Sequence, residues 1–219
     1  MDYEEEYYKQ VYGSLVQDSD YYNLASKISF NSYFKEIKDI NTKKILEFGC
    51  GLGKNIFLIR MLNVQGYDIS KFAKKFTGAR GIKTLKSEKE IKDNNFDIIL
   101  SCHNLEHMNN PLENLEFLRK KIKKKGLLLL IVPKEAQTMA TRTPDMVNYH
   151  LYSWNFRTIN NLLHKAGFEV LLNRVNYIGG PYLFKFLSKM SFKLYLLSIR
   201  LLGRIRNTGE LFIIARKTG

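Results

Sequence analysis

Short, nearly continuous runs of apolar residues alternate along this chain with longer stretches in which apolar residues recur every three or four positions. The short runs are typical of strands that are covered on both faces, and the longer stretches are typical of helices. Regular alternation of the two predicts an α/β fold. The predicted strands are Lys44–Phe48, Val64–Tyr67, Ile82–Leu85, Phe96–Ser101, Leu127–Val132, Phe168–Val175 and Leu211–Arg216.

Helices are expected between these strands. Asn110 can cap the helix that begins at Pro111, with proline at the first helical position. Gly167 can end the later helix that runs to Ala166. The first 40 residues are rich in tyrosine and are predicted to form helices that lead into one domain of 219 residues. The other helices are predicted to begin near Gly53, near Ser70, at Pro111 (running to about Lys124) and at a Ser153 cap (running to Ala166).

Composition narrows the class of protein. Hydrophobic residues make up 45% of the chain and charged residues 26%, which is the profile of an ordinary globular protein. The two cysteines, Cys50 and Cys102, are too few for a disulfide framework, so we expect a reducing cytoplasm. No apolar run approaches the ~20 residues that span a bilayer, so the protein is expected to be soluble or peripheral to a membrane.

More than half of the net charge of +14 lies in residues 170–219, which include an insertion predicted at residues 177–208. Seven basic residues and no acid lie between Glu169 and Glu210. If residues 182–206 formed one helix, an apolar surface would lie beside a basic stripe, as in helices that lie on anionic membranes. The stripe would comprise Lys185, Lys189, Lys193, Arg200 and Arg204. A hairpin broken at Ser188 or Ser191 and packed on the domain or on a second subunit is the alternative.

A glycine loop, Gly49-Cys50-Gly51-Leu52-Gly53, follows the first predicted strand directly. Glycines at such a turn let the backbone bend sharply and approach a ligand closely. A dinucleotide fingerprint, G-x-G-x-x-G, would need a third glycine at position 54 or 56, and these positions hold Lys54 and Ile56. The spacing therefore argues against a nicotinamide cofactor.

Five ordered segments resemble the class I S-adenosylmethionine-dependent methyltransferases over roughly residues 40–172, and the resemblance returns at 209–217. Residues 47–55 resemble motif I, and residues 96–107 resemble the strand-4 motif with its Leu-Glu-His ending. Gly66–Asp68, residues 125–133 and residues 150–168 resemble the second strand end, the fifth strand, and the late helix with the sixth strand. The resemblance implies a doubly wound, mostly parallel, seven-stranded, Rossmann-like sheet with a helical insertion before its last strand. It also implies S-adenosyl-L-methionine as the cofactor.

The same resemblance assigns cofactor-binding residues. Asp68 lies where the family keeps a carboxylate for the two ribose hydroxyls, since a carboxylate can accept both donors. Ser87 and Glu88 are the nearest candidates for the adenine amine. The full predicted set is Glu47, Gly49, Cys50, Gly51, Gly53, Asn55, Asp68, Ile69, Ser87, Glu88, Ser101 and Cys102.

Methyl transfer from a sulfonium releases a neutral leaving group, so the enzyme chiefly aligns the reactants and excludes water. A hydroxyl acceptor also benefits from a base, and histidine suits that role near neutral pH. His103 and His107 follow the fourth predicted strand, and His150 follows the fifth, so these three are the catalytic candidates. His107 could equally brace its loop. No metal is expected, although His103, Glu106 and His107 form an alternative set of metal ligands.

The favoured function is methyl transfer to a hydroxyl of a small molecule, a glycan or a lipid-linked intermediate. The resemblance is strongest to the small-molecule branch that includes ubiquinone-biosynthesis O-methyltransferases. A nucleic-acid acceptor is disfavoured, because Ser101–Asn104 replaces the Asn/Asp-Pro-Pro-Tyr/Phe motif that grips a flipped DNA base. Two alternatives stay open: a non-catalytic protein that docks on a membrane or partner through the insertion, and an RNA methyltransferase.

Overall fold

The structure is a computed structural model that describes residues 4–135, 149–181 and 183–218. Its centre is a seven-stranded sheet with the order β3-β2-β1-β4-β5-β7-β6. Strands β1 to β5 are parallel, and β7 runs antiparallel to both β5 and β6. The strands are β1 (Ile45–Phe48), β2 (Val64–Tyr67), β3 (Lys83–Leu85), β4 (Phe96–Cys102), β5 (Ile122–Pro133), β6 (Phe168–Tyr177) and β7 (Gly209–Lys217). The predicted α/β fold is confirmed.

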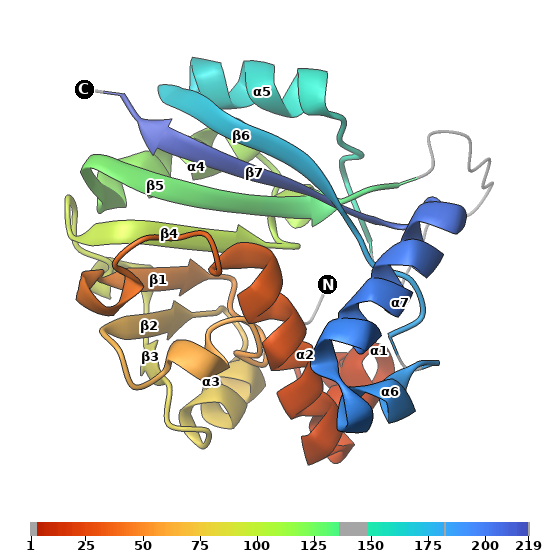
Figure 1. Cartoon of the computed structure of the whole chain (residues 1–219). Coiled ribbons are helices and arrows are strands. Elements are labelled where there is room, and N and C mark those ends of the chain that lie inside the picture. The colour runs from red at the N-terminus through yellow and green to blue at the C-terminus, as the bar shows by residue number, and fades with distance from the viewer. Residues whose placement is uncertain (1–3, 136–148, 182, 219) are drawn as a thin grey trace.

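Helices cover both faces of this sheet. Leu115 of α4 and Leu163 of α5 are fully buried on one face, and Phe34, directly after α2, is buried on the other. In Figure 1, α1, α2, α6 and α7 gather at the end of the sheet toward which β1, β2, β4 and β5 point. The helices are α1 (Glu5–Gln17), α2 (Ser19–Tyr33), α3 (Lys71–Gly78), α4 (Pro111–Lys121), α5 (Phe156–Lys165), α6 (Lys185–Met190) and α7 (Phe192–Ile205).

The helix predicted to begin near Gly53 does not form, and that expectation was wrong. A single 3-10 turn, Phe57–Ile59, stands in its place. Asn55 is drawn inward by a hydrogen bond from its Nδ2 to Glu47 Oε1 at 2.6 Å. Ile56 and Ile59 are both buried, and a spacing of three residues places them on one side of a 3-10 turn.

Two other helix boundaries differ from the prediction. The third helix ends at Lys121 rather than Lys124, because Ile122 is fully buried as the partner of Phe96 in the sheet. The fourth is capped by Asn155 rather than Ser153. Asn155 and Thr158 satisfy each other's backbone N–H groups, whereas the residue three places after Ser153 is a phenylalanine with no polar group to reciprocate.

The insertion forms two helices, not one. Ser191 ends α6 and caps α7 by accepting a hydrogen bond from the Leu194 N–H. One face of α7 is buried against α2. Tyr195 and Ile199 lie at the centre of this face and belong to the same buried cluster as Leu24 and Ile28 of α2. The structure thus contains a packed helical hairpin, and none of the described helices has the length and apolar character needed to cross a bilayer.

Candidate functional site

A cavity of about 550 Å³ lies at the edge of the sheet where the parallel strands end, a size in the usual range for small-molecule sites. The ends of β1, β2 and β4 supply part of its lining. Helices α1 and α2 supply much of the rest, and Ile178 and Pro181 join them from the start of the insertion. We call these the strand-end lining and the helical lining.

The glycine loop forms the floor of the strand-end lining. Gly49 has a φ of +75°, and a Cβ there would lie 2.7 Å from Asn104 Cγ, so a larger residue would meet both backbone strain and a collision. Gly51, with a φ of +48°, lines the cavity directly. The N–H groups of Gly49 and Cys50 both donate to the Tyr67 carbonyl, which ties the loop to β2.

Asp68 is held beside this loop by backbone donors. Its Oδ2 accepts from the Gly51 N–H at 2.7 Å and its Oδ1 from the Ser70 N–H at 2.9 Å. Burial raises the pKa of Asp68, and these donors act in the opposite direction. Asp68 also lines the cavity, so its carboxylate can accept from a donor that is bound there. Ile69 lines the cavity beside it and is 64% exposed, so it offers an apolar surface to a bound ring.

Glu47 Oε2 and Asn104 Nδ2 are among the buried polar atoms near the strand-end lining that have no hydrogen-bond partner in the part of the chain that the structure describes. Asn104 lines the cavity, whereas Glu47 lies behind Asn55 and accepts its amide N–H. Burial raises the pKa of Glu47 to about 8. A close backbone approach at the glycines, an oriented carboxylate and an unmet amide donor fit a nucleoside that bears hydroxyls and ring nitrogens.

Only some of the remaining predicted cofactor residues line the cavity. Glu88 and Cys102 line the cavity together with Cys50. Ser87, Ser101 and Gly53 are not part of the described lining. Gly53 instead faces Thr77 of α3, where a Cβ would lie 2.7 Å from the threonine methyl group, so its role is in packing.

His103 pairs with a carboxylate that sequence reasoning did not find. Its Nε2 lies 3.2 Å from Oε2 of Glu210, at the start of β7. Burial works against the charged imidazole, but the hydrogen bond and charge of Glu210 outweigh it and raise the pKa of His103. When Nε2 donates to Glu210, the neutral ring presents the Nδ1 lone pair as an acceptor. The His103 side chain is 41% exposed and lines the cavity.

Glu210 is itself nearly buried. Burial opposes its charge, yet the hydrogen bonds from His103, Tyr33 and Asn176 lower its pKa. Its position depends on two strand pairings: it lies opposite Pro133 of β5 and opposite Asn176 of β6. The arrangement resembles a base held by an orienting carboxylate. The only sequence signal was that Glu210 is the single acid in residues 170–219.

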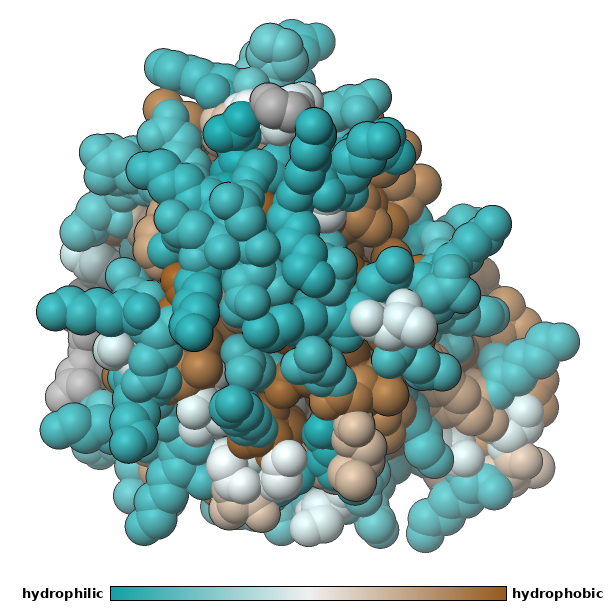
Figure 2. All heavy atoms as spheres, turned by 90° about the vertical axis from the view of Figure 1, so that its left-hand side faces the viewer, coloured by the Kyte–Doolittle hydropathy of each residue, from teal (hydrophilic) through white to brown (hydrophobic). Residues whose placement is uncertain are grey.

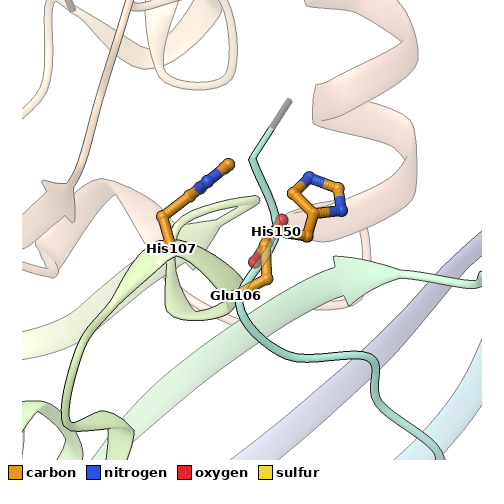
Figure 3. A group of neighbouring side chains, drawn as sticks. All are labelled: Glu106, His107 and His150. Atoms are coloured by element: carbon orange, nitrogen blue, oxygen red, sulfur yellow. The ribbon is translucent and has the colours of Figure 1, made fainter. Parts of the chain in front are cut away.

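The other two catalytic candidates lie together, with Glu106 (Figure 3). The ligand atoms of Glu106, His107 and His150 are within 4.8 Å of one another. Neither carboxylate oxygen of the fully buried Glu106 has a hydrogen-bond partner among the residues described, and burial raises its pKa. Burial and the neighbouring His150 lower the pKa of His107 to about 4. His150 also pairs with Glu135.

This cluster differs from the alternative metal set of the sequence analysis. His103 turns to Glu210, and His150 takes its place beside Glu106 and His107. One carboxylate with two imidazoles is a ligand set that divalent transition metals accept. Of the three histidines, His103 and His107 line the cavity and His150 does not. The Glu106 carbonyl accepts from the Leu151 N–H at 2.8 Å, so the backbone here braces the segment that carries His150.

The N-terminal helices contribute more to the site than the sequence indicated. Glu4 caps α3 by accepting from the N–H groups of Lys71 and Phe72, which fixes the start of α1. Tyr22 donates from its hydroxyl to the Leu52 carbonyl at 2.8 Å, which joins α2 to the glycine loop. The tyrosine-rich composition of this segment was the available signal. The tyrosines of α1 and α2 that line the cavity are Tyr7, Tyr8, Tyr12, Tyr21 and Tyr33.

Comparisons with known proteins agree with this geometry. A family model described as a methyltransferase domain matches residues 17–173. An uncharacterized protein of Methanocaldococcus jannaschii is 26% identical over 174 residues, 77% of this chain and 73% of that protein. A chain in the complex of the Haloferax volcanii Trm112 methyltransferase activator with a methyltransferase has a TM-score of 0.68 at 13% identity, covering 98% of both chains.

A SAM-dependent methyltransferase from Archaeoglobus fulgidus has the same fold, with a TM-score of 0.60 at 18% identity, over 96% of this chain and 100% of its own. At identities of 13% and 18%, the solved structures support the fold alone. The family model, which spans well over half of the chain, establishes the family. The chain therefore belongs to the methyltransferase-domain family, with the class I fold and S-adenosylmethionine as its cofactor.

Proposed function

We propose that this protein transfers a methyl group to a hydroxyl of a small, largely apolar acceptor, either free or linked to a lipid or glycan, as the ubiquinone-type O-methyltransferases do. The observation that carries the proposal is the His103–Glu210 pair on the cavity wall. A hydroxyl is a poor nucleophile until its proton is removed, and an imidazole oriented by a carboxylate is suited to removing it.

In this proposal the strand-end lining holds the cofactor, with Asp68 accepting from the ribose hydroxyls. When bound, the cofactor would supply a methyl group from its sulfonium, whose carbon–sulfur bond would break to leave a neutral thioether. His103 accepts the hydroxyl proton at Nδ1 while the new carbon–oxygen bond forms. Glu210 stabilises the resulting imidazolium through Nε2, at the 3.2 Å separation already present.

The helical lining supports an apolar or aromatic acceptor. Leu15, Ile28 and Ile178 line it together with the tyrosines of α1 and α2. Burial raises the pKa values of Tyr8 and Tyr12, so their hydroxyls are neutral near pH 7. Within the described lining, Lys54 is the one lysine or arginine, and its Nζ donates to Asn55 Oδ1 at 2.7 Å. The lining therefore has little positive charge with which to bind a phosphate-rich acceptor.

A methyl-transfer screen with labelled cofactor tests the proposal, using quinone-precursor, lipid, glycan and RNA pools. We expect label in pools of apolar hydroxyl compounds. Replacement of His103 by asparagine should lower turnover by about 10²- to 10⁴-fold and leave the Kd of the cofactor nearly unchanged. The matched control is His164→Asn, on the exposed side of α5, which should retain turnover.

Three outcomes bear on the alternatives. Label confined to RNA would replace the proposed acceptor class. Cofactor binding without transfer to any pool would support the non-catalytic interpretation. Loss of transfer on chelation, restored by a divalent ion, would move the chemistry to the cluster of Glu106, His107 and His150 and away from unassisted base catalysis.

A further inference from the structure

The helical hairpin of the insertion leaves a continuous apolar face exposed. On α7, Leu194, Leu197 and Leu201 recur at spacings of three and four, which places them on one side of the helix. Their side faces away from Tyr195 and Ile199, which are buried against α2. The large apolar residues exposed on the hairpin, each between 52% and 76%, are Leu183, Phe186, Met190, Leu194, Leu197, Leu201 and Ile205.

A row of cations flanks this face. At 100° per residue, Lys193, Arg200 and Arg204 fall within about 40° of arc, to one side of the apolar row. All three are exposed. Lys189, exposed on α6, is a further cation of the hairpin. Lys185 does not belong to the row, because its Nζ pairs with Asp18 Oδ2 at 2.5 Å. Among the residues described, Lys189, Lys193 and Arg200 form no ion pair with an acid.

The face at the opposite end of the molecule is different (Figure 2). The face in Figure 2, at the opposite end of the molecule from the hairpin, is mainly hydrophilic, with smaller apolar areas between its polar side chains. The row of exposed apolar side chains on α7 thus contrasts with the face at the opposite end of the molecule (Figure 2). Contiguous exposed apolar area of this kind marks a surface that contacts something apolar.

We propose that α6 and α7 form a docking surface for an anionic lipid bilayer. The apolar row enters the boundary between head groups and acyl chains, and the cation row contacts the anionic head groups. The charge selects this occupant. Residues 170–209 contain seven basic residues and no acid, so a second copy of the hairpin would bring cations against cations.

Docking in this orientation places the membrane beside the acceptor side of the cavity. Ile178 and Pro181, which line the cavity, directly precede the hairpin in the sequence. A lipid-borne acceptor could thus enter from the bilayer without crossing bulk water. This last step rests on the proposed function, whereas docking itself is measured without cofactor or acceptor, so the two can fail separately.

Vesicle flotation tests the docking. The full chain is mixed with phosphatidylcholine vesicles that either contain or lack phosphatidylglycerol, at an ionic strength of about 20 mM and again at about 300 mM, where the Debye length is several times shorter. We expect flotation with the anionic vesicles, a large decrease at the higher salt, and little binding to phosphatidylcholine alone.

Paired variants separate the two rows. Lys189→Glu with Lys193→Glu should weaken flotation at least about tenfold, because each cation near an anionic surface contributes appreciably to binding. The matched control, Lys92→Glu with Lys124→Glu, changes the net charge equally on exposed sites outside the hairpin and should weaken it much less.

A second pair of variants tests the apolar row. Leu197→Gln with Leu201→Gln should reduce flotation even at low salt, while the control pair Met61→Gln with Leu171→Gln, exposed on other elements, should not. Unchanged melting temperatures establish that all four variants fold. Absent flotation at low salt, or equal losses in test and control pairs, overturns the proposal. Concentration-dependent dimerisation that is abolished by the leucine pair, with no flotation, would assign the face to a second copy instead.

Discussion

Replacing Glu210 by glutamine should lower the pKa of His103. Glutamine keeps the shape and an acceptor oxygen but removes the negative charge that lies 3.2 Å from Nε2. A hydrogen bond to a charged group contributes about 1.5–3 kcal/mol, which corresponds to one to two pKa units at 1.36 kcal/mol per unit. Because the His103 side chain is 41% exposed to the cavity, solvent screens the pair, and we expect a decrease of about one unit.

Histidine titration by NMR measures this without any acceptor. The chain has four histidines, and His164, on the far side of the sheet from Glu210, serves as the internal control. Its midpoint should be the same in the wild-type chain and in Glu210→Gln. A His103 midpoint that stays constant or rises in the variant would refute the assignment of Glu210 as its partner.

The same pair predicts how stability depends on pH. The raised pKa of His103 stabilises the folded state below the ordinary histidine value of 6.5, and this contribution is lost as the pH rises through the raised value. The lowered pKa of Glu210 stabilises above the ordinary glutamate value of 4.5, and this contribution is lost as the pH falls. The free energy of unfolding should therefore differ most between wild type and Glu210→Gln at pH 4.5–6.5.

Three further outcomes are expected. Asp68→Asn should raise the Kd for S-adenosylmethionine by about tenfold or more, measured by calorimetry, since a charge-assisted contact to the ribose is worth about 1.5–3 kcal/mol; unchanged affinity would place the ribose elsewhere. Glu47→Gln should have little effect near pH 4.5 in thermal melts and should stabilise the protein increasingly as the pH rises toward 8, because burial raises the pKa of Glu47 to about 8 whereas the unfolded chain releases this proton near pH 4.5. The reverse pH dependence would contradict the burial of that carboxyl group. Gly49→Ala should destabilise by at least about 1–2 kcal/mol in urea unfolding, from the positive φ alone, and the contact with Asn104 adds to it; a neutral effect would mean that the loop relaxes.

The sequence predicted the centre of the sheet well because strands such as β1 and β4 are buried on both faces, where apolar runs are nearly continuous. The glycine loop and Asp68 could be found because each lies within a few residues of a strand end, so local spacing identifies them. The missing helix after Gly53 shows the limit of this reasoning. In place of that helix, the Asn55 side chain bonds to the buried Glu47. A contact between two side chains leaves no periodic pattern in the sequence.

The rest of the site depends on long-range pairing. Glu210 lies 107 residues from His103 in the sequence, and the register of β7 against β5 brings the two together. A one-residue shift of that register would turn Glu210 to the other face of the sheet. The cavity-lining tyrosines of α1 and α2 likewise come from a segment whose place over the strand ends is fixed by Glu4 and Tyr22, through contacts with backbone groups far along the chain.

The antiparallel direction of β7 makes the hairpin a modular attachment. Because β6 ends and β7 begins at the same edge of the sheet, Tyr177 lies opposite Gly209, and the 31 residues between them leave and re-enter at neighbouring points. The cost of closing such a loop grows only slowly with its length. The hairpin could therefore be shortened, lengthened or exchanged while the register of β6 and β7, and with it the place of Glu210, is preserved. The proposed membrane docking could thus be altered while the His103–Glu210 pair is kept, and because Ile178 and Pro181 line the cavity, residues 183–206 are the natural unit to graft between members of the family.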